Sequence, residues 1–263
     1  MNTLAIVKPL TQKITKKSFI IKNTQGEYFD ECFTQYLDEN KSDNTPTFYS
    51  KIFSPEYWKA KHAISGVAQG RGATYFIQPN SNNHWVLRHY YRGGLIGKLN
   101  RDSYIFTGIE KTRAYREFHL LYQLHEKGLP VPMPVAYRVI KKGICYHADL
   151  LSQRIENAQD LVGMLTKQAI TSDLWHKIGA VIKTFHDNNV YHHDLNAHNI
   201  LIDDQEKIWI IDFDQGEIRE KTQTWKNTNL ARLERSFIKE KNKLAVFCWE
   251  DKNWQQLLKG YQL

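Results

Sequence analysis

The chain has 263 residues, which is long enough for two lobes, and its 41% hydrophobic and 24% charged residues are typical of a folded globular protein. No apolar stretch approaches the length of a membrane span, and the N-terminal residues lack the apolar core of a signal peptide, so we expect a cytosolic protein. Three scattered cysteines suggest neither a disulfide framework nor a zinc site, and the net charge of +8 favours an anionic partner, although a generally basic surface gives the same sum.

The N-terminal part of the chain predicts strands and a glycine-containing turn. Residues 18–23 (SFIIKN) are the clearest strand among the first 50, and residues 64–78 (ISGVAQGRGATYFIQ) lead into the turn PNSNN and a second strand, NHWVLRHYY. Gly70 and Gly72 flank Arg71, and backbone amides beside glycine can approach phosphate oxygens closely. The order GxxxGxG differs from the GxGxxG of protein kinases, and a plain hairpin has the same composition.

The next strand and helix contain a possible phosphate-binding ion pair. Protein kinases carry a lysine on the strand after the glycine loop, and it contacts the ATP phosphates and pairs with a glutamate on the following helix. Arg88 stands at that place here, with Lys98 as the competing candidate. Residues 112–128 (TRAYREFHLLYQLHEKG) have helical apolar spacing, which makes Glu117 the expected partner unless it pairs with a neighbouring arginine on the helix surface.

Further along, residues 137–152 predict two strands around a KKG turn, and the polar residues 153–160 (QRIENAQD) predict a hinge that contacts adenine through its backbone. We place a lobe boundary near Ile155, which divides the chain into 1–155 and 156–263. Helices are predicted over 161–166 and 171–189. A basic amphipathic helix is predicted within 229–243, and such a helix usually packs on a core.

Two strings carry the strongest functional signal. HHDLNAHNILID, at 192–203, matches the spacing of the kinase catalytic loop, and IIDFDQG, at 210–216, matches the metal-binding motif. Asp194 is the expected acceptor of a hydroxyl proton, while Asn199 and Asp212 are the expected Mg²⁺ ligands. The apolar runs between them predict a hairpin that brings the two motifs together. The sequence therefore predicts ATP-dependent phosphoryl transfer.

The same strings depart from regulated protein kinases. His193 replaces the arginine that receives an activation-loop phosphate, and no APE string follows Gly216, so we expect a constitutive enzyme. Asp214 occupies the glycine position of DFG, where it either assists a second metal ion or makes a turn hydrogen bond. His192 is expected to brace the loop by hydrogen bonding.

Over about residues 50–245 the chain resembles the lipopolysaccharide core kinases of Gram-negative bacteria, and among them those that act on 3-deoxy-D-manno-octulosonic acid (Kdo). The resemblance is carried by the two strings above and by the strings GRGATYFI, WVLRHYYRGGLIGKL, REFHLL and WKNTNLARLERSFIK. It implies a bilobal, protein-kinase-like α+β fold with a β-rich N-lobe and a mainly helical C-lobe. It further implies ATP- and Mg²⁺-dependent phosphorylation of the Kdo 4-hydroxyl of Kdo-lipid IVA by a peripheral enzyme at the cytoplasmic face of the inner membrane.

For an acceptor that bears carboxylate and phosphate groups, the candidate contacts are Arg92, Lys98, Arg232 and Arg235, each of which could equally be a solvated charge. The alternatives are a heptose kinase or another small-molecule kinase, an atypical protein kinase of the RIO type, and a pseudokinase or nucleic-acid-binding module. The intact motif residues argue against a pseudokinase. The aromatic residues lie in core-like patterns, which argues against nucleic acid as a partner.

Overall fold

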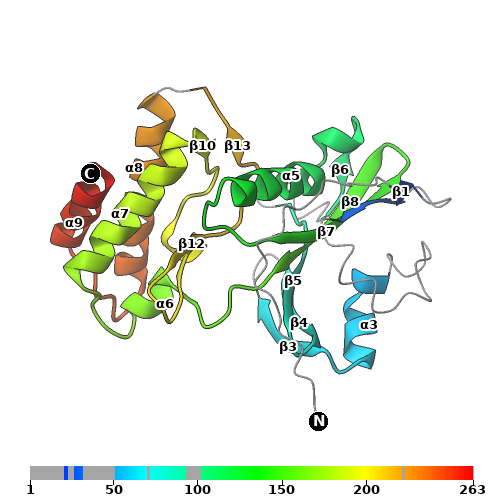
Figure 1. The fold of residues 1–263 in the computed structure, drawn as a ribbon, viewed down its shortest axis with the longest axis horizontal. Coiled ribbons are helices and arrows are strands. Elements are labelled where there is room, and N and C mark those ends of the chain that lie inside the picture. Colours follow the sequence, from blue (N-terminus) through cyan, green and yellow to red (C-terminus); the bar gives the residue numbers. More distant parts are fainter. Residues whose placement is uncertain are drawn as a thin grey trace, which may run out of the picture.

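A computed structural model describes residues 21–22, 27–31, 51–69, 72–92, 102–220 and 223–262 of the chain. In the first half of this described part, eight strands form one antiparallel sheet in the order β1-β2-β7-β8-β5-β4-β3, with β6 paired to β8 (Figure 1). The strands are β1 (Ile21–Lys22), β2 (Glu27–Glu31), β3 (Ile64–Gln69), β4 (Ala73–Asn80), β5 (Asn83–His89), β6 (Tyr104–Ile105), β7 (Pro134–Lys142) and β8 (Cys145–Gln153).

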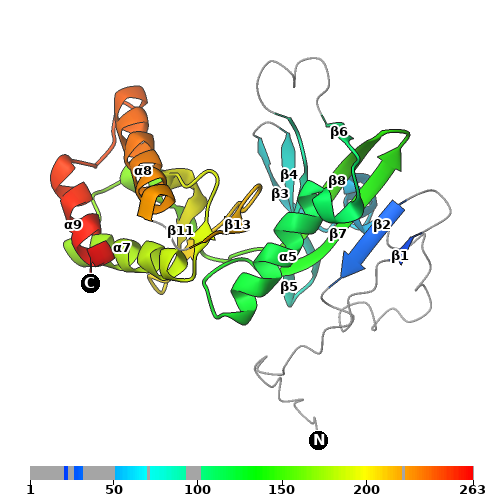
Figure 2. The same ribbon diagram turned by 90° about the horizontal axis from the view of Figure 1, so that it is seen from above.

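The helix α5 (Arg113–Glu126) packs against β7 and β8 and follows the single 3₁₀ turn η2 (Ile109–Lys111) (Figure 2). Its apolar residues recur every three or four positions and are buried, as the sequence predicts. The short α3 (Pro55–Ala60) begins at Ser54, whose side chain accepts a hydrogen bond from the backbone of Tyr57, and buries Trp58 against Ile77 and Trp85.

The second half is mainly helical (Figure 1). Its elements are β9 (Gln159–Asp160), α6 (Leu161–Leu165), α7 (Ser172–Asp187), β10 (Val190–Tyr191), η3 (Ala197–Asn199), β11 (Ile200–Ile202), β12 (Ile208–Ile210), β13 (Glu217–Ile218), α8 (Gln223–Lys243) and α9 (Asp251–Gln262). The predicted helices at 161–166, 171–189 and 229–243 and the predicted hairpin are confirmed by α6, α7, α8 and the antiparallel pair β11–β12.

The helix α9 is not among the elements predicted from the sequence. It lies along α7 at a distance that only glycine permits, because a Cβ atom at Gly179 would lie 2.0 Å from the carbonyl oxygen of Leu257. A Cβ atom at Gly260 would lie equally close, at 2.0 Å, to the carbonyl oxygen of His176. These two glycines therefore allow the close contact between the backbones of α7 and α9.

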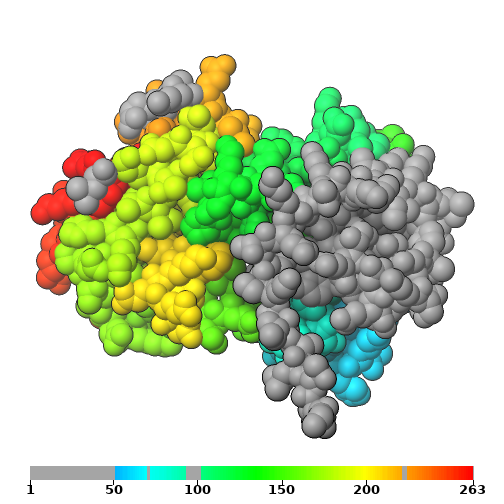
Figure 3. Space-filling model, viewed as in Figure 1, coloured from blue at the N-terminus to red at the C-terminus, as the bar shows by residue number. Residues whose placement is uncertain are grey.

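A continuous cluster of buried residues joins the two halves, running from Tyr90 and Phe118 through Phe213 to Leu257. In the space-filling view the green surface of the first half borders the yellow-green surface of the second (Figure 3). The expected α+β fold, with a β-rich first half and a mainly helical second half, is confirmed. The boundary near Ile155 stays a prediction, and of the strand predicted at 18–23 only residues 21–22 lie within the described part.

Two further sequence-based expectations concern thiols and membrane spans. Cys145 and Cys248 are free thiols that are only partly buried, although buried thiols were expected, and Cys32 lies outside the described residues. Among the helices of the described residues, none is long and apolar enough to span a bilayer.

Candidate active site

The loop at 192–199 connects β10 to β11 and is held by its own polar side chains. The carbonyl oxygen of Asp194 accepts hydrogen bonds from the side-chain amides of Asn199, at 2.9 Å, and Asn196, at 3.0 Å. The carboxylate of Asp194 is 44% exposed, whereas Asn199 is buried. The loop therefore presents one carboxylate to solvent on a backbone that is fixed from within.

His192 links this loop to the second motif. Its Nδ1 accepts a hydrogen bond from the backbone N–H of Asp194 at 3.2 Å, so its Nε2 carries the hydrogen that is donated to the carbonyl oxygen of Ile211 at 2.9 Å. Burial lowers the pKa of His192, which keeps the ring neutral in this arrangement. The expected bracing role of His192 is confirmed by these two contacts.

Asp212 follows β12 and is brought beside Asn199 by the hairpin register. Ile200 pairs with Ile210, and the N–H of Ile211 donates to the carbonyl oxygen of Asn199 at 3.0 Å. Asp212 then adopts a φ of 63°, in the left-handed region that aspartate tolerates better than most residues. After this turn the two side chains have different surroundings. Asp212 pairs with Arg88, whereas Phe213 is fully buried and lies against the His192 ring.

Arg88 on β5 joins the first half to this motif. Its guanidinium donates to both carboxylate oxygens of Glu117 on α5, at 2.5 Å, and to the carboxylate of Asp212. Tyr90 donates to Glu117 at 2.6 Å, and its ring lies 5.1 Å from the guanidinium carbon. The structure thus contains the Arg88–Glu117 ion pair that the sequence predicts, while Lys98 lies outside the described residues.

The charges in this network perturb one another. Burial, the largest effect, raises the pKa of Glu117 to about 7 against the opposing attraction of Arg88. Burial also acts to raise the pKa of Asp212, but the adjacent Arg88 holds it below its usual value. For Arg88, burial is outweighed by Glu117 and Asp212, so its pKa rises well above the usual range. The guanidinium therefore remains a fixed positive charge.

A cavity of about 470 Å³ lies between the two halves, within the size range of nucleotide and cofactor pockets. Arg88, Glu117, Asn199 and Asp212 form its polar end. Its apolar walls come from both halves, and the predicted hinge contributes to its edge; these lining residues are Ala68, Phe76, Val86, Leu121, Leu150, Leu201, Gln153, Arg154, Ile155, Ala158, Gln159 and Asp160. The cavity therefore offers apolar walls that suit a flat ring. At its polar end it offers one cation, Arg88, and two residues with oxygen ligands, Asn199 and Asp212.

A smaller cavity of about 160 Å³ shares Arg88 and Asp212 with the larger one and is also lined by Gly72, Tyr91 and Asp214. A Cβ atom at Gly72 would lie 1.9 Å from the Tyr91 ring, so any larger residue here would require the Tyr91 side chain to move. The other two expected phosphate-contacting residues, Gly70 and Arg71, lie outside the described residues.

Asp214 is paired with Arg113 on α5 at 3.1 Å. In the turn after Phe213, the backbone N–H of Gly216 donates to the carbonyl oxygen of Phe213 at 2.7 Å. Arg113 is thereby engaged with Asp214, while Arg116 pairs with Glu217 at 3.6 Å. Because Arg113 and Arg116 have these partners, Glu117 pairs with Arg88 and not with a neighbouring arginine of its helix. The two contacts also attach α5 to the second motif.

The acceptor candidates are placed differently. Arg232 on α8 lies at the site, since it pairs with the carboxylate of Asp194 at 3.2 Å. Arg92 lies over the ring of Tyr104, 4.9 Å from the ring centre, and Arg235 is exposed on α8. Lys98 is again outside the described residues.

Sequence reasoning missed the residues of α8 that support the loop. Asn229 is fully buried; its side chain donates to the carbonyl oxygen of His192 at 3.0 Å and accepts from the N–H of the same residue at 3.2 Å. The hydroxyl of Ser236 accepts from the N–H of Ala197 at 3.0 Å. Asn229 and Ser236 both lie in WKNTNLARLERSFIK, one of the strings that carry the family resemblance, but helical periodicity assigns only the apolar residues of this string to a partner.

The donor set at the polar end suits Mg²⁺. This ion prefers oxygen ligands, and the cavity offers the Asp212 carboxylate and the side-chain amide of Asn199. The amide nitrogen of Asn199 is engaged with the loop backbone, so its oxygen is the atom available to a cation. Arg88 beside these groups supplies the kind of contact that polyphosphates require.

Comparison with known proteins agrees with this geometry. The model of the lipopolysaccharide kinase (Kdo/WaaP) family matches residues 55–261. The chain is 46% identical over 241 residues to the 3-deoxy-D-manno-octulosonic acid kinase of Actinobacillus succinogenes, covering 89% of this chain and 97% of the relative. It is 50% identical to the kinase of that name from Vibrio vulnificus, covering 80% and 88%, and 45% identical to that from Haemophilus influenzae, covering 81% and 90%. The chain therefore belongs to the lipopolysaccharide kinase (Kdo/WaaP) family.

Proposed function

We propose that this protein transfers the γ-phosphoryl group of ATP to the 4-hydroxyl of the Kdo residue of Kdo-lipid IVA. The observation that carries the proposal is the grouping of Asn199, Asp212 and Arg88 at the polar end of the cavity, with Asp194 held on the same loop as Asn199 by a hydrogen bond to it. The names of the relatives and their coverage support Kdo as the acceptor sugar. In this proposal residues 1–155 form the N-lobe, residues 156–263 form the C-lobe, and adenine lies along 153–160.

The roles of the residues follow from their places. Asp194, on the fixed loop, orients the acceptor hydroxyl and takes up its proton as the bond to phosphorus forms. Arg88 holds the donor phosphates and is itself positioned by Glu117. Bound Mg²⁺ supplies charge neutralisation on the transferred group, and Asn199 and Asp212 are the residues that would hold it.

The acceptor side of the proposal rests on charge. Kdo bears a carboxylate and lipid IVA bears phosphates, which suit guanidinium groups such as that of Arg232 beside Asp194. The net charge of +8 supports contact with an anionic membrane surface, so we place the enzyme as a peripheral protein at the cytoplasmic face of the inner membrane.

An acceptor comparison tests the proposal. The enzyme, radiolabelled ATP and Mg²⁺ are incubated in separate reactions with one of three acceptors: Kdo-lipid IVA, a heptosylated core lipid or a generic acceptor protein. The variant Asp194→Asn serves as the blank. We expect label on Kdo-lipid IVA, and phosphorus-coupled NMR of the product to place the phosphate at the 4-position. Label confined to the heptosylated lipid or to the protein would assign the enzyme to a different acceptor and overturn the proposal.

A further inference from the structure

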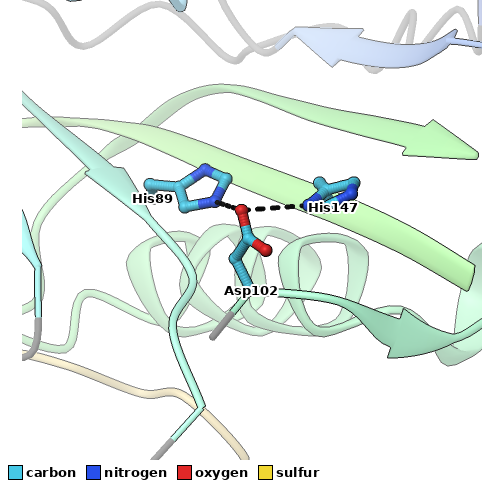
Figure 4. A group of neighbouring side chains, drawn as sticks. All are labelled: His89, Asp102 and His147. Carbon is cyan, nitrogen blue, oxygen red and sulfur yellow. Dashed lines mark hydrogen bonds and ion pairs between the residues drawn. The ribbon is translucent and has the colours of Figure 1, made fainter. Parts of the chain in front are cut away.

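A second group of chemically capable side chains lies on the sheet outside the candidate active site. His89 ends β5, His147 is on β8, and Asp102 precedes β6, as Figure 4 shows. The strand register explains the meeting: His89 pairs with Asp149, and Tyr104 pairs with Tyr146, which carries the chain containing Asp102 alongside β8. Three separate segments thus converge on one point.

The ligand atoms are spaced as a metal ion requires. Oδ2 of Asp102 lies 3.2 Å from Nε2 of His89 and 3.1 Å from Nδ1 of His147, and all three atoms lie within 4.8 Å of one another. Four ligands at about 2.0–2.1 Å around Zn²⁺ stand about 3.4 Å apart. The two separations that involve Asp102 are therefore already close to those of a tetrahedral site. The third separation, between the two imidazole nitrogens, is at most 4.8 Å.

A buried carboxylate prepares His89 for this role. Asp149 is 4% exposed, and its Oδ1 lies 2.7 Å from Nδ1 of His89, while its Oδ2 accepts a hydrogen bond from Arg138 at 2.8 Å. With Nδ1–H donated to Asp149, the lone pair of Nε2 is directed at Asp102. Metal-binding histidines commonly have such an outer carboxylate, because it fixes the tautomer and the ring orientation.

The arrangement needs a positive charge at its centre. When His89 is neutral, its Nε2 and the facing oxygen of Asp102 are both acceptors, and two acceptors at 3.2 Å repel each other. One proton added to His89 relieves this, because the ring then donates to both Asp149 and Asp102, and a divalent cation bound to Nε2 in place of that proton relieves it in the same way. A single divalent cation satisfies all three groups at once.

We propose that His89, Asp102 and His147 bind a divalent transition-metal ion, for which Zn²⁺ is the best fit. Two imidazoles and one carboxylate are ligands that Zn²⁺ accepts and that Mg²⁺ disfavours. The side chains of His89, Asp102 and His147 are 25%, 37% and 20% exposed, which gives the ion a route from solvent and leaves room for water as a fourth ligand. The bound ion links Asp102 to β8 and to β5 at His89, the residue that follows Arg88.

Metal titration of the intact, tag-free chain tests the site. After dialysis against a chelator, Zn²⁺ is titrated by calorimetry in competition with a chromophoric chelator, and Co²⁺ is used to record visible absorption bands. We expect one equivalent to bind to the wild type with the Co²⁺ spectrum of nitrogen and oxygen ligands. Asp102→Asn and His147→Gln, which keep side-chain size, should each weaken binding by about 10–100-fold or more.

His125→Gln is the matched control, since this histidine is exposed on α5 away from the cluster. It should bind Zn²⁺ as the wild type does, and circular dichroism establishes that every variant is folded. Zn²⁺ should also raise the melting temperature of the wild type and the control more than that of the two ligand variants. Binding that is equally tight in folded Asp102→Asn and in the wild type, or no stoichiometric binding to the wild type, overturns the proposal. Neither outcome depends on kinase activity.

Discussion

The substitution Glu117→Gln tests how the protein balances a buried charge. Glu117 is 3% exposed and lies between Arg88 and Tyr90. Glutamine keeps the shape and a hydrogen-bonding carbonyl but has no charge to titrate. Burial raises the pKa of Glu117 from 4.5 to about 7 despite the attraction of Arg88, so the native state holds a proton that the unfolded chain releases at lower pH.

The sign and size of the effect follow from linkage. Between about pH 4.5 and 7 the native state binds more protons than the unfolded state, so the contribution of Glu117 to the free energy of unfolding is fully present below this range and is lost as the pH rises through it. Each pKa unit corresponds to about 1.4 kcal/mol, which gives roughly 3 kcal/mol for Glu117. As the pH rises through this range, the free energy of unfolding of the wild type, relative to that of Glu117→Gln, should fall by that amount.

Urea unfolding followed by circular dichroism gives the free energy of unfolding of each protein at several pH values from about 5 to 8, and the difference between the two proteins is compared across these values. Glu126→Gln is the matched control, because it removes a carboxylate from an exposed position on the same helix. A Glu117 difference that stays constant, or that grows in favour of the wild type as the pH rises, would refute the reasoning. The second result would mean that the attraction of Arg88 outweighs burial.

Three further changes address catalysis and packing. Asp194→Asn should lower kcat by about 10²–10⁴-fold and leave Mg·ATP binding within a few-fold, measured by steady-state kinetics and nucleotide titration, because in the proposed mechanism only the proton acceptor is lost. Arg88→Lys should raise the KM for ATP by roughly tenfold, since an ammonium lacks the fork that reaches two carboxylates and phosphates together; an unchanged KM would point to another cation. Gly179→Ala should lower the free energy of unfolding by about 1–3 kcal/mol, measured in urea, because the new methyl group meets the α9 backbone.

The parts of the site that the sequence predicts are those set by local chain geometry. Asp194 and Asn199 belong to one short loop, and the register in which β11 pairs with β12 places Asp212 beside Asn199. Alternating and apolar runs also determine where strands and helices form, because burial repeats with the period of each element. Motif spacing and periodicity therefore carry most of the candidate site and the α+β class.

The rest depends on contacts between distant segments, which no local pattern encodes. The ion pair of Arg88 with Glu117 could be anticipated only by analogy with kinases, and its third partner, Asp212, comes from the other half of the molecule. The packing of α9 on α7 depends on two glycines 81 positions apart, each of which reads in isolation as a weak point in a helix. The meeting of His89 with Asp102 and His147 similarly depends on strand order, and the scattered histidines gave no signal in the sequence.

The helix α8 shows why a correct element can still conceal its role. Its apolar stripe, which includes Leu233 and Phe237, is fully buried, as the amphipathic pattern predicts. The polar residues beside that stripe are not simply solvated, because Asn229 and Ser236 bond to backbone groups of the loop at 192–199 and Arg232 pairs with Asp194. A loop has few backbone partners of its own, so a helix that supplies them fixes its conformation. The string that marks the family in this helix is thus tied to the placement of Asp194 as well as to packing.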